Sequence, residues 1–98
     1  MNKLAKTKPQ RYSLLDWQQR RQLREDYVRT QGGNCHHCNE PISGKPSASV
    51  LKKKIDWTLF PDNFLKYPCH LHHNHDTDMT IGAVHAYCNA VLWQYYGE

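Results

Sequence analysis

The clearest hydrophobic periodicity lies in the first third of the chain, in the segment "SLLDWQQRRQLREDYVRTQGG". Ser13 suits a helix N-cap, Asp16 suits the first turn, and two glycines at 32 and 33 suit the end. We therefore predict one amphipathic helix over residues 13–31. Its apolar stripe comprises Leu14, Trp17, Leu23, Tyr27 and Val28.

Arginines occupy much of the remaining surface of this predicted helix. They are Arg20, Arg21, Arg24 and Arg29. Such a charged face is either solvated or lies along nucleic acid, and the pattern favours the solvated interpretation.

The rest of the chain gives weaker periodic signals. "SVLKKKI" and "KYPCHLHH" predict strands, and "DWTLFPDNFL" between them predicts an irregular or short helical connection. Residues 76–80 predict a turn, followed by an extended piece near residues 79–81 and a final helix over about 83–96. The apolar candidates of that helix are Val84, Val91, Leu92 and Tyr95.

Length and composition describe a single small domain. The 98 residues are 39% hydrophobic, carry a net charge of +4 and have no run approaching the ~20 apolar residues of a membrane span. We expect a soluble, cytoplasmic protein with a basic flexible tail over 1–12 and one domain over 13–98. The positive charge leans toward an anionic partner such as DNA, and so small a core would benefit from a structural metal.

Cysteine spacing predicts that metal to be Zn²⁺. Cys35 and Cys38 form a C-x-x-C pair in a zinc knuckle over residues 33–44, and His85 and Cys88 form a second pair at the start of the final helix. Cys69 is the rival fourth ligand; His85 ranks higher because its spacing to Cys88 mirrors the knuckle. The alternative is that Cys88 is a small buried hydrophobe and His85 a capping residue.

A second concentration of metal-binding side chains is "CHLHHNHD", with histidines at 70, 72, 73 and 75. Alternate positions of a strand face opposite sides, so a metal ligand and a general base at neighbouring positions require a bend or a strand end. The following turn residues supply one. A metal-storage patch or a chance surface cluster is the alternative.

Together, "QGGNCHHC" and "LHHNHDTDMTIGAVHAYCNAVLW" resemble the HNH endonuclease family, in its zinc-stapled branch similar to phage endonuclease VII. The resemblance covers about residues 27–96. It implies a small α+β fold of the ββα-metal, treble-clef-like type, with an N-terminal helix and a core over about 66–96.

The resemblance also implies roles for individual residues. His73 stands at the general-base position, and His72 with Asn89 at the positions that bind a catalytic Mg²⁺, Mn²⁺ or other divalent ion. His75 matches a position near the phosphate or the base. Relatives often have Asp where this chain has His72, which shifts metal preference toward softer ions. They usually have Cys where it has His85, which still completes an ordinary zinc site.

The implied activity is hydrolysis of DNA phosphodiester bonds by a phage- or mobile-element-encoded enzyme, with a dimer as one route to double-strand breaks. The basic residues that we expect to contact DNA are Lys3, Lys6, Lys8, Arg11, Lys52, Lys53 and Lys54. Two alternatives remain: a non-catalytic, zinc-stapled nucleic-acid-binding module, and a nuclease of the same fold that acts on RNA. Asp76 and Asp78 are either extra ligands or, as we favour, turn formers.

Overall fold

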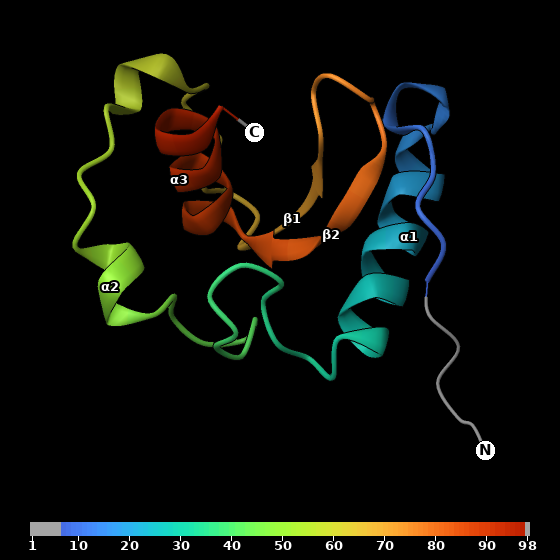
Figure 1. The fold of residues 1–98 in the computed structure, drawn as a ribbon, viewed down its shortest axis with the longest axis horizontal. Coiled ribbons are helices and arrows are strands. Elements are labelled where there is room, and N and C mark those ends of the chain that lie inside the picture. The colour runs from blue at the N-terminus through green and yellow to red at the C-terminus, as the bar shows by residue number, and fades with distance from the viewer. Residues whose placement is uncertain (1–6, 98) are drawn as a thin grey trace.

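A β-hairpin flanked by two helices forms the centre of the molecule in this computed structural model, which describes residues 7–97 (Figure 1). Strand β1 (Cys69–His73) pairs antiparallel with β2 (Thr80–His85). Helix α1 (Trp17–Thr30) packs against one side of the hairpin, and α3 (Ala86–Tyr96) continues directly from β2 on the other. The fold is therefore a small α+β arrangement, as predicted.

The first long helix begins later than residue 13, because Asp16 rather than Ser13 caps it. The Asp16 carboxylate accepts a hydrogen bond from the amide of Gln19, whose side chain accepts one from the Asp16 amide in return. Ser13 lies instead in the 3₁₀ turn η1 (Tyr12–Leu14). Gly32 and Gly33 follow the helix with φ of 69° and 81°, a left-handed conformation that glycine adopts without strain.

Only the later part of the predicted apolar stripe enters the core. Leu23 and Tyr27 are buried against Leu71 and Ala83 of the hairpin, whereas Leu14 and Trp17 are exposed. A second buried cluster joins the knuckle, the short helix α2 (Ala48–Leu51) and helix α3 around Val84.

One predicted strand and the predicted start of the final helix need correction. The segment "SVLKKKI" contains the helix α2 (Ala48–Leu51), which Ser47 caps, instead of a strand. Strand β2 runs as far as His85, so the final helix begins at Ala86 and not near residue 83. The connection over 56–65 does contain a short 3₁₀ helix, η2 (Trp57–Leu59), as predicted.

The described part of the N-terminal tail is docked on the hairpin, which corrects the prediction of a loose segment up to residue 12. The Thr80 amide donates to the Gln10 carbonyl at 2.8 Å, and the Tyr12 amide donates to the Asp78 carbonyl at 2.7 Å. These bonds extend the hairpin by one short backbone pairing. Residues 1–6, which include Lys3 and Lys6, lie outside the described part of the chain.

Candidate functional site

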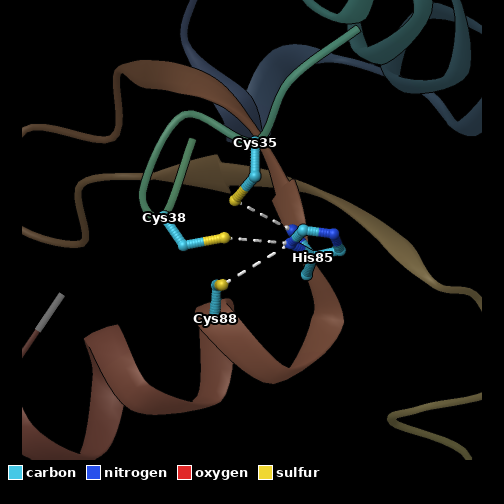
Figure 2. A group of neighbouring side chains, drawn as sticks. All are labelled: Cys35, Cys38, His85 and Cys88. Carbon is cyan, nitrogen blue, oxygen red and sulfur yellow. Dashed lines mark hydrogen bonds between the residues drawn. The ribbon is translucent and has the colours of Figure 1, made fainter. Parts of the chain in front are cut away.

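Four predicted zinc ligands converge from three parts of the fold (Figure 2). Cys35 and Cys38 come from the knuckle, His85 from the end of β2, and Cys88 from the first turn of α3. Their ligand atoms all lie within 4.8 Å of one another. Ligands on a tetrahedral zinc ion with bonds of about 2.0–2.3 Å stand roughly 3.3–3.8 Å apart, so this set could hold a metal such as zinc.

Backbone groups orient His85 and Cys35 within this cluster. His85 Nε2 donates a hydrogen bond to the Pro41 carbonyl at 2.9 Å. Its other ring nitrogen, Nδ1, therefore faces the thiols of Cys38 and Cys88, at 3.4 and 3.7 Å. The His85 amide donates to the Cys35 sulfur at 3.4 Å. A histidine that donates through one ring nitrogen and presents the other is the arrangement that metal sites use.

A hydrogen bond between the Cys35 and Cys88 thiols changes the pKa of both groups. A hydrogen bond from Cys88 lowers the pKa of Cys35 to about 4, and the same bond together with burial raises the pKa of Cys88. Because cysteine binds metal as the thiolate, binding of zinc would release the protons that the thiols of the cluster still carry. Cys69 lies outside the cluster, and burial raises its pKa.

The predicted catalytic residues occupy the hairpin and the following helix. His72 is 2% exposed, and its Nδ1 lies 3.2 Å from Oδ1 of Asn89. The Asn89 amide nitrogen lies in turn 3.1 Å from Nδ1 of His70. Asn89 on α3 therefore joins two histidines of β1, which face the same side of the strand as their alternation predicts.

His70 has no role in the predictions from sequence, and the structure makes it part of this arrangement. Its ring accepts the Asn89 amide and thereby turns Oδ1 toward His72. The strand alternation that places 70 and 72 on one face was the available signal. Burial lowers the pKa of His70, which keeps its ring neutral and able to accept.

His73 faces the opposite side of β1, toward α1. Its ring stacks on Tyr12, with centroids 3.8 Å apart and an interplanar angle of 5°, and His75 lies 4.7 Å away. The Arg20 guanidinium lies 4.0 Å from the centroid of the same Tyr12 ring. Two groups this close to one ring must occupy opposite faces, so Tyr12 lies between Arg20 and His73.

Burial lowers the pKa of His73, and the neighbouring charges of His75 and His72 lower it further. The ring is consequently neutral at pH 7, the state in which imidazole can accept a proton. The pairing of the strands also shifts here, from His72 opposite Gly82 to His73 opposite Thr80. Bulges of this kind are common beside active sites, where they redirect side chains.

The acidic turn residues have structural contacts. The Asp78 carboxylate accepts hydrogen bonds from the amide and the hydroxyl of Ser13, and the same bonds lower its pKa. The Asn74 side chain accepts from the amides of Asp76 and Thr77. The Asp78 bonds hold the N-terminal segment against this turn, and the Asn74 bonds form the turn itself.

Comparisons of the chain with models of protein families, with curated proteins and with solved structures found no match. Its function must therefore be argued from the site itself.

The predicted DNA contacts are spread over the surface. Lys52 and Lys54 are exposed beside the C-terminal half of α3, and Lys53 lies with its ammonium 5.0 Å from the Tyr95 ring. Lys8 and Arg11 are exposed on the docked N-terminal segment. No helix among residues 7–97 is long and apolar enough to cross a membrane.

Proposed function

We propose that the chain is a metal-dependent endonuclease of the HNH type that hydrolyses DNA phosphodiester bonds. The observation that carries this proposal is the 3.2 Å separation of His72 Nδ1 and Asn89 Oδ1, with His73 next along the same strand. Two adjacent ligands of an octahedral ion with bonds of about 2.1 Å stand roughly 3 Å apart, so this pair has the spacing of two ligands of one ion.

Each residue of the site then has a distinct task. His72 and Asn89 would hold the divalent ion, and His70 would orient the Asn89 amide. The bound ion would stabilise the negative charge that develops on the phosphate and the leaving oxygen. His73 accepts the proton of the attacking water, for which its lowered pKa suits it at neutral pH. His75, whose ring centroid lies 4.7 Å from that of His73, would contact the phosphate.

The Cys₃His cluster has a separate, structural role in this proposal. Four ligands of this kind would complete the tetrahedron around a zinc ion and leave no position for a substrate, which is the pattern of structural zinc sites. By joining the knuckle to the β2–α3 junction, the zinc would fix Asn89, which directly follows Cys88. The fold would thus be a ββα-metal core stapled from one side.

The test is conversion of supercoiled plasmid to the nicked form by zinc-loaded protein. We expect nicking only when Mn²⁺, Mg²⁺ or another divalent ion is added, and we expect Asn89→Ala to remove it while leaving zinc content unchanged. Wild-type protein that binds DNA but does not nick it with any divalent ion would favour the non-catalytic binding module instead.

A further inference from the structure

A groove of about 810 Å³ lies between α1 and the segment that leads into β1. Its lining includes His73, His70 and Asn89, three residues of the proposed catalytic site. Whatever binds in this groove therefore lies against the proposed base, His73, and one proposed metal ligand, Asn89.

Both walls of the groove carry an exposed aromatic ring. Trp17, in the first turn of α1, is 69% exposed, and Tyr67, on the opposite wall, is 64% exposed. Neither ring belongs to a buried cluster. Large apolar rings exposed on both sides of one groove are suited to stacking on flat ligands.

The charges around the groove are mainly positive. Arg20, Arg21 and Arg24 line it from α1. Lys66 adds a cation beside the other wall, 5.6 Å from the Tyr67 ring. Glu25 is the one acidic side chain among the described lining residues, and Arg21 pairs with it at 3.3 Å. The groove thus combines aromatic rings with cations, which matches a polymer of flat bases and phosphates.

We infer that this groove binds a single-stranded polynucleotide, with bases stacked on Trp17 and Tyr67 and the backbone along Arg24 and Lys66. Bases within a duplex already stack on one another, so their faces cannot reach these rings, whereas unpaired bases can. This inference rests on the proposed function and narrows its substrate to a strand that is unpaired at the cleavage point. It also moves the principal nucleic-acid contacts from the predicted lysines to α1.

Binding should be measured by fluorescence anisotropy with zinc-loaded full-length protein and no further divalent ion, so that cleavage does not interfere. The probes are a labelled thymidine oligonucleotide, its uridine equivalent and a DNA duplex of the same length. We expect both single strands to bind more tightly than the duplex. The tighter-binding strand of the two shows whether the groove prefers deoxyribose or ribose.

Trp17→Ala and Tyr67→Ala should each weaken single-strand binding by about 5- to 150-fold, the usual effect of removing one base–aromatic stack. Both side chains are exposed, so the variants should fold normally. Tyr96→Ala, which removes an exposed tyrosine outside the groove, is the aromatic control. Arg24→Gln should also weaken single-strand binding. Arg29→Gln is its control, because Arg29 lies on the same helix but outside the groove and pairs with Asp26.

Duplex binding that equals or exceeds single-strand binding would overturn this inference, as would Trp17→Ala and Tyr67→Ala variants that bind like Tyr96→Ala. Nicking assays distinguish the two proposals. Tight, Trp17-dependent single-strand binding without cleavage in any divalent ion supports the groove and contradicts the nuclease. Cleavage by a protein that does not prefer single strands supports the nuclease and contradicts the proposed role of the groove.

Discussion

His85 shows how one side chain can belong to two elements at once. It is the last residue of β2 and the N-cap of α3, so its backbone joins strand to helix while its ring faces Cys38 and Cys88. Cys88 is completely buried, in one core cluster with Cys35, Val84 and Val91. A metal at this point would therefore stabilise the junction on which Asn89 depends.

Cys88→Ser should therefore abolish zinc binding and unfold the protein. Structural zinc contributes on the order of 10–16 kcal/mol in small zinc domains, which exceeds the total stability of most chains of this size. Cys69→Ser is the matched control, because Cys69 lies outside the cluster, and it should retain about one zinc per chain. Metal analysis and thermal unfolding would check both. Equal zinc content in the two variants would contradict the assigned ligand set.

The Tyr12–His73 stack makes a prediction about pH dependence. The proposed base must be neutral, so the nicking rate should rise with pH through the His73 pKa, with a midpoint below the ordinary histidine value of about 6.5. Tyr12→Ala would expose the ring to water and remove the burial that lowers the pKa. The midpoint should consequently move to higher pH.

The pH–rate profiles of wild type, Tyr12→Ala and Leu14→Ala provide the measurement. Leu14 lies in the same 3₁₀ turn and is exposed, so its substitution should leave the midpoint unchanged. An identical midpoint in all three proteins would show that His73 does not set the rate.

At the scale of elements, the knuckle is fixed to the hairpin by a side chain. Gln31 accepts the Ala83 amide through Oε1 and donates to the carbonyls of Ala83 and Asn34 through Nε2. The closeness of this contact requires glycine at 82, since a Cβ there would lie 2.7 Å from Gln31 Oε1 and 3.0 Å from the His36 ring.

Gly82→Ala should lower the free energy of unfolding by about 1–3 kcal/mol, because the Gln31 amide cannot move without losing these bonds. Gly44→Ala is the control: a Cβ there would meet its nearest atom at 3.6 Å, an ordinary contact. Its effect should stay within about 0.5 kcal/mol. Urea unfolding of both variants checks the comparison, and equal stabilities would mean that the knuckle can shift freely from β2.

Elements with short-range signals could be predicted from sequence, and those that depend on distant contacts could not. Cys35, Cys38 and Cys88 were identifiable because metal ligands occur at short, regular spacings. The docking of Tyr12 on His73 depends on hydrogen bonds between residues more than sixty positions apart, which no local pattern encodes. The strand predicted over 49–55 failed because Ser47 caps a helix there, and Val50 reaches the core from it.

For the whole molecule, the proposed function gives the two sides of the hairpin different tasks. Helix α3 lies on one side of the hairpin and α1, with the docked N-terminal segment, on the other (Figure 1). His72 and Asn89 meet on the α3 side, and Asn89 and His73 both line the groove beside α1. The hairpin thus places His72 and His73 on opposite faces of β1, and Asn89 lies beside the proposed base in the groove.

The most direct test of this account compares plasmid nicking by zinc-loaded wild type and His73→Ala in Mn²⁺. If His73 is the general base, the substitution should lower the nicking rate by about 10²- to 10⁴-fold. Zinc content and thermal unfolding should remain those of the wild type, because His73 lies outside the zinc cluster and the buried core. Nicking by His73→Ala at the wild-type rate would contradict the account.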